Sequence, residues 1–205
     1  MFENYFPALS ETQQKQLLAL GDLYREWNAR INVISRQDIG SLYEHHVLHS
    51  LALHSWILER QGGWTQGTRI VDVGTGGGFP GIPLAILNPG CEFLLVDRIG
   101  KKVRVAQEVA DAIGLKNVVT RHAGIEEIRQ PADWVVSRAV MAMPDLLKAC
   151  RRVYSSGLVC LKGGDLTDEL KGCPGAEVTP VSRYFSEPFF ETKAIVYVPA
   201  RDKKR

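Results

Sequence analysis

The sequence lacks paired cysteines and long hydrophobic runs. Its four cysteines, Cys91, Cys150, Cys160 and Cys173, form no Cys-x-x-Cys pair and match no zinc or disulfide spacing. No apolar stretch approaches membrane-spanning length, and Met1–Tyr5 lacks the basic start and apolar core of a signal peptide. We therefore expect a reduced, cytoplasmic protein without a metal centre, in which Cys91 and Cys160 are small buried hydrophobic residues.

A strong excess of charge of one sign is also absent. The 25 basic and 23 acidic residues leave a net charge of +2, which by itself does not indicate a nucleic-acid partner. The 205 residues, 45% of them hydrophobic, suit one substantial core with a small appendage. Basic residues are nevertheless grouped, as RNA phosphates would require, although solvated helix faces explain the groups equally well. The groups are Arg98, Lys101, Lys102 and Arg104; Lys148, Arg151 and Arg152; and the tail Arg201–Arg205.

Glycine is plentiful, and it is concentrated between Asp72 and Gly81. This segment reads Asp-Val-Gly-Thr-Gly-Gly-Gly-Phe-Pro-Gly, follows the short run Arg69–Val71 and precedes the helix-like run Ile82–Leu87. A strand that leads through a glycine-rich turn into a helix is typical of a nucleotide cradle. Glycine lets the backbone approach a ligand closely, and the amides at the helix start face that ligand.

Two carboxylates favour one ligand over another. Asp72, two residues before Gly74, would repel the pyrophosphate of a dinucleotide but attract the sulfonium and ammonium of S-adenosylmethionine (SAM). A second strand-like run, Glu92–Val96, ends at Asp97, where a carboxylate binds a ribose diol in NAD and SAM proteins alike. Because the loop also fits the weak G-x-G-x-x-G pattern, NAD remains the alternative to SAM as cofactor.

The first sixty or so residues have a helical pattern. Ser10 and Gln13 form a capping box, and apolar residues three and four apart predict a helix continuing to Ile34. A second helix is predicted from Ile39 to about Leu58, followed by a glycine-rich linker. The predicted domains are a helical extension, residues 1–64, and a Rossmann-like domain, residues 65–205. The aromatic residues of the two helices, Tyr24, Trp27 and Trp56, are expected in the core.

Strands and helices alternate from Arg69 onward. The predicted strands are Arg69–Val73, Glu92–Asp97, Asn117–His122, Asp133–Arg138 and Gly157–Lys162, and the predicted helices are Ile82–Asn88, Lys101–Ile113 and Met143–Val153. This alternation predicts an α/β fold with a doubly wound parallel sheet. Ala176–Phe185 and Lys193–Pro199, with no helix between them, predict an antiparallel hairpin. A parallel sheet closed by such a hairpin is the architecture of Rossmann-like class I SAM-dependent methyltransferases.

The glycine segment, Asp97 and the run Ser137-Arg138-Ala139 together resemble the RsmG (GidB) family of bacterial 16S rRNA guanine-N7 methyltransferases. The resemblance extends from about Leu20 to Val198 and includes two helix signatures, Asn28–Ser35 and His46–Ser50. It implies methyl transfer from SAM to N7 of a guanine in the 16S rRNA of the small ribosomal subunit, at position 527 in the usual numbering of that RNA. No exposed apolar stripe demands a partner subunit, so we expect a monomer.

The motif and the resemblance imply a set of site residues. The expected cofactor-binding residues are Asp72, Gly74, Gly76, Phe79, Asp97, Ile125, Glu126 and Arg138, and the expected substrate-binding residues are Asn32, His46 and Lys162. In this assignment Asp97 holds the ribose, and Ile125 and Glu126 frame the adenine. The sequence departs from the family at His49, where many members carry an acid, and at Gly124, where a basic residue is common.

The sequence after the fourth predicted strand fits methylation of guanine N7. That atom carries a lone pair and no proton, so the reaction needs orientation rather than a general base. Ser137–Val140 replaces the Asn/Asp-Pro-Pro-aromatic motif of amino-group methyltransferases, and no Pro-Cys or Thr-Cys nucleophile is present. Arg138 is the expected catalytic residue. Facing N7 directly, it would oppose the positive charge that develops there, so the SAM carboxylate, an RNA phosphate and guanine O6 stay open as its partners. A surface salt bridge at a strand end is the alternative role.

Other functions stay open from the sequence alone. His45, His49 and His54 suggest a zinc site because His45 and His49 are one helical turn apart, but no acid or cysteine completes the ligand set. A methyltransferase of a small molecule or protein, a non-catalytic SAM sensor and an NAD-dependent oxidoreductase are the alternatives. The oxidoreductase lacks support because the sequence has no Tyr-x-x-x-Lys motif.

Overall fold

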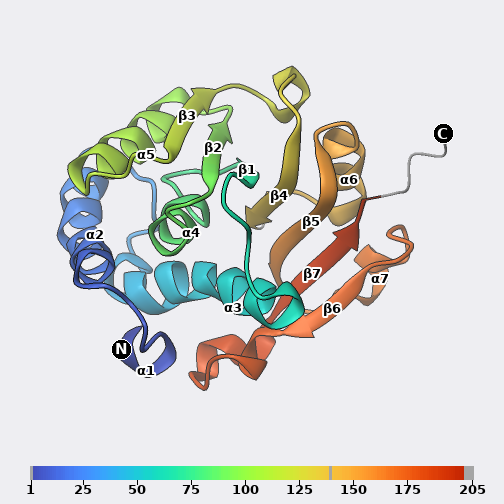
Figure 1. Ribbon diagram of the computed structural model, residues 1–205, viewed down its shortest axis with the longest axis horizontal. Coiled ribbons are helices and arrows are strands. Elements are labelled where there is room, and N and C mark those ends of the chain that lie inside the picture. The colour runs from blue at the N-terminus through green and yellow to red at the C-terminus, as the bar shows by residue number, and fades with distance from the viewer. Residues whose placement is uncertain (1, 139, 201–205) are drawn as a thin grey trace.

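The computed structural model describes residues 2–138 and 140–200, so Ala139 and the basic tail Arg201–Arg205 lie outside the described residues. A twisted seven-stranded sheet crosses the molecule, with helices on both sides (Figure 1). The strands are β1 (Arg69–Val73), β2 (Glu92–Asp97), β3 (Val118–His122), β4 (Ala132–Arg138), β5 (Tyr154–Gly163), β6 (Glu177–Pro180) and β7 (Lys193–Pro199). Their spatial order is β3-β2-β1-β4-β5-β7-β6.

The sheet confirms the predicted fold class. Strands β1 to β5 are parallel, whereas β7 runs antiparallel between β5 and β6. The carboxyl ends of β2, β1, β4 and β5 therefore lie in a row at one edge of the sheet. In parallel sheets of this kind, ligands bind outside that edge.

The helices cover the two faces of the sheet unequally. They are α1 (Phe2–Tyr5), α2 (Glu11–Arg30), α3 (His49–Gln61), α4 (Gly81–Leu87), α5 (Gly100–Ala112), α6 (Met143–Cys150) and α7 (Thr167–Leu170). The 3₁₀ turns are η1 (Ile39–Ser41), η3 (Ile125–Glu127), η4 (Val181–Arg183) and η5 (Pro188–Thr192), and η2 (Leu42–Leu48) is a π-helix. Helices α2 to α5 share one apolar cluster with one face of the sheet, and α6 belongs to the cluster on the other face.

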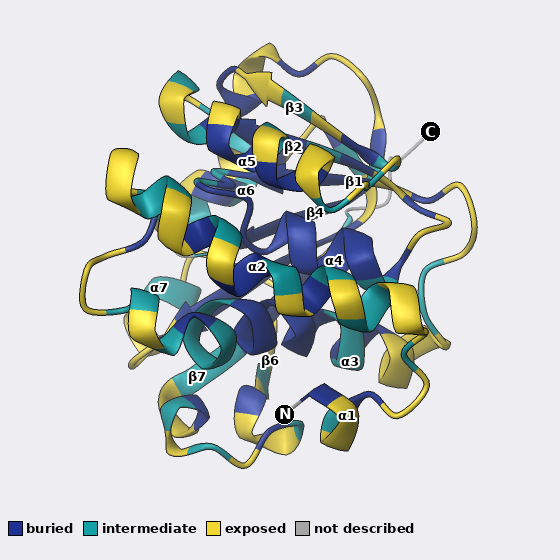
Figure 2. Cartoon of the chain, turned by 90° about the vertical axis from the view of Figure 1, so that its left-hand side faces the viewer, coloured by how far each residue is buried: buried dark blue, intermediate teal, exposed yellow. Residues whose placement is uncertain are grey.

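The first cluster contains most of the aromatic side chains and joins the predicted extension to the sheet. Tyr24 and Trp56 are buried in it, as predicted, together with Phe93 and Trp134 of the strands, while Trp27 is half-buried. Figure 2 shows α2 with one buried face toward the sheet and one exposed face toward solvent. Because both predicted parts build one core, the division between residues 64 and 65 stays a prediction.

The second cluster is mainly aliphatic and contains three of the four cysteines. Among the described residues all four cysteines are buried and none forms a disulfide. The prediction that Cys91 and Cys160 behave as small apolar residues is therefore confirmed.

Helix α2 begins as predicted but ends earlier. Ser10 and Gln13 form the reciprocal capping box. The helix stops at Arg30 because Ile31 is extended and the Asn28 side chain takes over the following turn, accepting from two backbone amides and donating to the Ile34 carbonyl. The predicted continuation to Ile34 was wrong, because an asparagine side chain offers the backbone hydrogen bonds that compete with a helix.

Other elements differ from prediction as well: β5 begins three residues earlier than predicted, at Tyr154, and α6 ends three residues earlier, at Cys150. Strand β6 ends at Pro180 and is followed by η4, so the predicted strand Ala176–Phe185 was too long; Pro180 has no amide proton and limits strand pairing. The connection to β7 contains η5, although no helix was predicted there. The second predicted helix exists, but it begins as η1 and passes through the π-helix η2 before α3.

Candidate functional site

The glycine loop between β1 and α4 is built around the buried side chain of Asp72. Asp72 is fully buried, and its Oδ2 accepts hydrogen bonds from Thr75 Oγ1 at 2.6 Å and from the Gly81 amide at 2.8 Å. A Cβ at Gly81 would lie 2.8 Å from Asp72 Oδ2, so only glycine allows this approach. Asp72 thus fixes both ends of the loop, and the first amide of α4 points to Asp72 rather than to a ligand.

Asp72 keeps one unsatisfied oxygen. Its Oδ1 has no hydrogen-bond partner among the described residues. Burial raises the pKa of Asp72 to about 7, against the opposing effect of the Thr75 and Gly81 hydrogen bonds. A cation bound above the loop would favour the ionised carboxylate, so the charge state of Asp72 is poised to respond to a positively charged ligand.

Asp97 at the end of β2 orders the outer side of the loop. Its Oδ2 accepts from the Gly76 amide at 2.9 Å and its Oδ1 from the Ile99 amide at 2.8 Å. A carboxylate has further acceptor positions on both oxygens. A Cβ at Gly76 would meet no atom within 4 Å, so the loop is open on the side next to Asp97. This open side, lined by a carboxylate, suits the ribose of a nucleoside ligand.

The other side of the loop contacts the segment that follows β4. Gly74 has a φ of +67°, and a Cβ there would lie 2.4 Å from Cγ2 of Val140. Val140 is 40% exposed, so it lies against the loop and still presents an apolar surface to solvent. The loop is therefore bounded by Asp97 on one side and by Val140 on the other.

Arg138, the last residue of β4, contacts the N-terminal helical segment at η2. Its Nη2 donates to Nδ1 of His46 at 2.9 Å, its Nη1 donates to the His45 carbonyl at 3.3 Å, and its guanidinium lies 5.3 Å from the centre of the Phe79 ring. A guanidinium only donates, so His46 Nδ1 accepts and the ring proton is on Nε2. The π-helix η2 supplies both acceptors, His45 and His46, and π-helices are frequent at functional sites.

In the described part of the chain Arg138 forms no salt bridge, although the charge of Asp72 acts on it and opposes the lowering of its pKa. Among the described residues, its polar contacts are neutral, and no carboxylate forms a salt bridge with it. Burial and the charge of Arg138 lower the pKa of His46 to about 3, and the same causes lower the pKa of His49 to about 3. Burial lowers the pKa of Arg138 to about 10, so it stays protonated at neutral pH. A desolvated cation of this kind favours an anionic ligand.

Phe79 contacts protein on both sides. Its ring packs on Tyr24 at 4.8 Å between centroids and on His46 at 5.3 Å, and only 3% of the residue is exposed. The Tyr24 hydroxyl donates to the Gly77 carbonyl at 2.6 Å. Phe79 and Tyr24 therefore tie the glycine loop to α2, and the predicted contact of Phe79 with SAM stays a prediction.

Lys162 is buried rather than displayed at the mouth of the site. It is 8% exposed, and its Nζ donates to the Met141 carbonyl and to Glu169 Oε1, both at 2.6 Å. The same Glu169 oxygen accepts from the Met143 amide at 2.6 Å. Lys162 thus holds the chain after β4, and the predicted contact with RNA stays a prediction.

The remaining predicted residues lie at the periphery of this group. Ile125 is buried in η3, whereas Glu126 is exposed and forms an ion pair with Arg98 at 2.7 Å. Asn32 is exposed in the turn after α2. The structure brings together the glycine loop, Asp97, Arg138 and His46, but leaves Asn32 on the surface.

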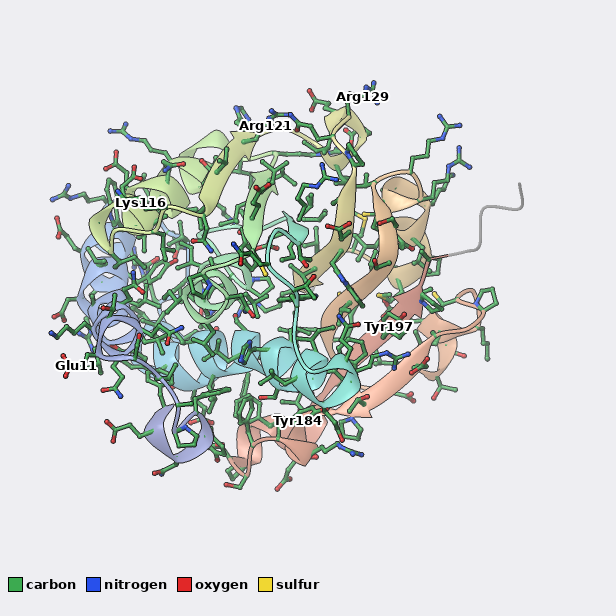
Figure 3. The ribbon with its side chains drawn as sticks, in the orientation of Figure 1. Glu11, Lys116, Arg121, Arg129, Tyr184 and Tyr197 are labelled. Atoms are coloured by element: carbon green, nitrogen blue, oxygen red, sulfur yellow. The ribbon has the colours of Figure 1, made fainter. Side chains whose placement is uncertain are left out.

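The two family departures have clear positions. His49 is 6% exposed, and its Nε2 has no partner among the described residues. Near Gly124, the basic side chains Arg121 and Arg129 extend outward at the edge of the molecule (Figure 3). Arg121 contacts Gln130 and Arg129 contacts the Glu126 carbonyl, so both remain close to η3.

Three residues of the site escaped the sequence analysis. Thr75 stands between two glycines, and its hydroxyl bond to Asp72 depends on the turn that the loop makes. Val140 and Glu169 carry no motif, because their contacts with Gly74 and Lys162 arise only from the packing of separate segments. In the described part of the chain, no group of three or more His, Cys, Asp or Glu is placed to hold a metal ion. No helix there is long and apolar enough to cross a membrane.

Comparison with solved structures supports the fold. The chain is similar to magnesium protoporphyrin IX methyltransferase from Synechocystis PCC 6803, solved with bound SAM, with a TM-score of 0.61 over 95% of this chain and 99% of that one, at 11% identity. A SAM-dependent O-methyltransferase from Thermotoga maritima gives a TM-score of 0.58 over 82% and 71% of the two chains, at 14% identity. At these identities the similarity shows the fold alone.

Sequence relatives are much closer. A family profile described as GidB, rRNA small subunit methyltransferase G, matches residues 13–185. Proteins named Ribosomal RNA small subunit methyltransferase G are 56% identical in Bacteroides thetaiotaomicron, over 94% of this chain and 96% of the relative, and 49% identical in Porphyromonas gingivalis, over 97% and 92%. The relative of the same name in Flavobacterium psychrophilum is 46% identical over 97% of both chains. The chain therefore belongs to the GidB family of rRNA small subunit methyltransferases G.

Proposed function

We propose that this protein transfers a methyl group from SAM to N7 of a guanine in the 16S rRNA of the small ribosomal subunit. Family membership supports the reaction class and the RNA, since the relatives are named for small-subunit rRNA methylation. We further propose that the protein acts as a monomer in the cytoplasm. The observation that supports the proposal most is the arrangement at the carboxyl edge of the sheet. There the carboxylate of Asp97 and the open glycine loop lie on one side, and the guanidinium of Arg138, at the end of β4, lies on the other.

The residues fit SAM as the cofactor. The space next to Gly76 is open within 4 Å of a Cβ there, and the remaining acceptor capacity of Asp97 suits a ribose diol. The buried Asp72, whose Oδ1 has no hydrogen-bond partner among the described residues, favours positive charge above the loop. When bound, SAM supplies a methyl group on a sulfonium, which is already electrophilic and needs no further activation by the protein.

The acceptor side fits an atom that carries no proton. N7 of guanine attacks with an in-plane lone pair, so no base has to remove a proton. The imidazole next to Arg138 belongs to His46, and its Nδ1 already accepts a hydrogen bond from Arg138. His46 is neutral at physiological pH because its pKa is lowered to about 3. The protein therefore contributes orientation rather than acid–base chemistry at this position.

Arg138 is proposed to bind an anion rather than the reacting nitrogen. A guanidinium facing N7 would oppose the positive charge that develops on the purine. The lack of a carboxylate partner among the described residues favours the carboxylate of SAM as the group that Arg138 holds. His46 and the His45 carbonyl would then orient the guanidinium toward that carboxylate.

The decisive experiment is mapping of methyl groups on small-subunit RNA. Purified protein is incubated with methyl-labelled SAM and either small-subunit particles or naked 16S rRNA, and N7-methylguanine is located by chemical cleavage. We expect one modified guanine and no label in a control with heat-inactivated protein. Label at another atom, or label only in small molecules or proteins, would contradict the proposed substrate.

A further inference from the structure

Lys162 and Glu169 form a mostly buried ion pair beside the segment that follows β4. Their side chains are 9% and 24% exposed, and Nζ lies 2.6 Å from Oε1. Burial raises the pKa of Glu169, but the hydrogen bonds from Lys162 and Met143 outweigh this effect and hold the pKa below its usual value. Glu169 is therefore ionised at neutral pH and carries its charge inside the protein.

This ion pair is fastened to the backbone at two points. Lys162 Nζ donates to the Met141 carbonyl, and Glu169 Oε1 accepts from the Met143 amide, the first amide of α6. The two contacts enclose a short stretch that immediately follows Val140. Glu169 also satisfies one of the helix amides that has no partner within its own helix.

The fastened stretch determines where Val140 lies. Val140 contacts the glycine loop at Gly74 and remains partly exposed at the same edge. The residues after β4 border the loop on the side away from Asp97, so a methyl acceptor approaching a ligand from this side would meet them. A displacement of Val140 would therefore change the position of the acceptor relative to the methyl group.

A buried ion pair is weak evidence of a contribution to stability. Removing two charges from water costs several kcal/mol, and apolar replacement of such pairs is often neutral for stability. The three contacts of Lys162 and Glu169, with each other, with the Met141 carbonyl and with the Met143 amide, instead define one backbone geometry. This favours a role in positioning.

We propose that Glu169 is a positioning residue for methyl transfer: through Lys162 and the Met143 amide, it fixes the segment of Val140 against the glycine loop. This inference rests on the proposed function. Glu169 touches neither cofactor nor RNA in this role, and it acts only through the chain that it holds.

The test uses two variants of the full-length protein. Glu169→Gln keeps an acceptor for the Met143 amide but removes the charge, and Glu169→Leu removes both. We expect kcat for small-subunit methylation to fall about threefold in the first and about 30-fold in the second, because sub-ångström misplacement is costly in an oriented reaction. The Kd for SAM, measured by calorimetry, should change less than threefold, and rates are measured at a temperature where each variant is folded.

A matched control comes from the same short helix. Lys171 and Asp168 form an exposed ion pair at 2.6 Å, so Lys171→Met with Asp168→Asn removes the same charges without touching the segment. This double variant should keep the kcat of the unmodified protein.

A second readout is independent of activity. Hydrogen exchange of the Met143 amide should accelerate at least tenfold in Glu169→Leu and little in the control. Unchanged kcat in folded Glu169→Leu, unchanged exchange, or a loss confined to SAM affinity would each overturn the role of Glu169. An unmodified protein that fails to methylate the RNA would instead refute the proposed function, while exchange would still report on the ion pair. If Glu169→Leu does not fold, kcat of Glu169→Gln decides the question: a fall of about threefold supports the role, and an unchanged kcat overturns it.

Discussion

The carboxyl edge of the sheet has two halves of opposite charge. On one half, Asp72 and Asp97 place carboxylates at the ends of β1 and β2, and on the other, Arg138 and Lys162 place cations at the ends of β4 and β5. Each charge is used differently: Asp97 is half-buried and accepts two backbone amides, Asp72 is buried, Arg138 forms no salt bridge with any described residue, and Lys162 is paired. The two halves therefore differ in how much of the hydrogen-bonding capacity of each charge is already used within the protein, which a strand-end position alone does not reveal.

The largest effect is expected on the cationic half, from Arg138→Met. Loss of the guanidinium removes the proposed anion contact and should lower kcat/KM for RNA methylation about 100-fold, which corresponds to about 2.7 kcal/mol. Arg138→Lys should restore little, since an ammonium cannot reproduce the planar contacts to His46 and the His45 carbonyl. Steady-state methylation assays measure the effect, with circular dichroism to verify folding. A folded Arg138→Ala protein that methylates RNA at the normal rate would show that the assignment is wrong.

On the anionic half, Asp97→Asn should weaken SAM binding about tenfold, near the 1.5 kcal/mol typical of a hydrogen bond to a charged group. Both Asp97 oxygens accept backbone amides, so the NH₂ of asparagine would face one of these donors. Calorimetry with SAM measures the change. Asp133→Asn is the matched control, because Asp133 accepts from the Arg69 amide at the opposite end of the strands. If Asp97→Asn and Asp133→Asn bind SAM equally well, Asp97 does not contribute to SAM binding.

The ionisation of Asp72 predicts a pH dependence of SAM affinity on the anionic half. Its pKa of about 7 in the free protein means that a cationic ligand meets an ionised carboxylate at pH 8 but mostly a neutral one at pH 6. Relative to Asp72→Asn, the unmodified protein should bind SAM up to about tenfold more tightly at pH 8 than at pH 6. Calorimetry of both proteins at the two pH values tests this, and parallel pH profiles would contradict it.

Asp72 is also expected to lower the free energy of unfolding as the pH rises. The folded pKa of Asp72 lies above the unfolded value, so its contribution is most favourable below the unfolded pKa and is lost as pH rises toward about 7. Compared with Asp72→Asn, the ligand-free protein should lose at most about 1.4 kcal/mol per pH unit across this window. Denaturant unfolding at pH 4.5 to 7.5 provides the measurement.

The smallest effect is expected from surface cations away from the edge. Lys148, Arg151 and Arg152 are exposed at the end of α6 and form no salt bridge among the described residues, whereas Lys15, Arg25 and Arg30 on α2 each pair with an acid. The logarithm of the RNA-binding constant falls linearly with the logarithm of the salt concentration, by about 0.7 for each phosphate contact to a single strand. Replacing Lys148, Arg151 and Arg152 by glutamine should therefore make this slope shallower by about 2.

The matched triple replacement on α2 should leave the slope nearly unchanged. Filter binding to 16S rRNA at several salt concentrations compares the two variants. A larger change for α2 would instead favour RNA contacts through the N-terminal helices.

The sequence by itself determined the order of elements and the position of the nucleotide-type loop. Strands β1, β2 and β7 have the predicted bounds, and the glycine spacing located the turn that Asp97 borders. These features depend on neighbours in the chain, on hydrophobic periodicity and on the conformational freedom of glycine, all of which are local. Belonging to the GidB family likewise follows from sequence alone.

Only the tertiary structure decided what each charged residue does. Asp72 lies beneath the loop, His46 accepts from Arg138, and Lys162 pairs with Glu169, because strands and helices distant in sequence pack these side chains together. Burial and hydrogen-bond partners determine the pKa of such groups and how many of their donor and acceptor positions stay unused. Burial and partners depend on the whole fold, so no short stretch of residues encodes them. The chemistry of the site is therefore a property of packing, whereas its location is a property of the sequence.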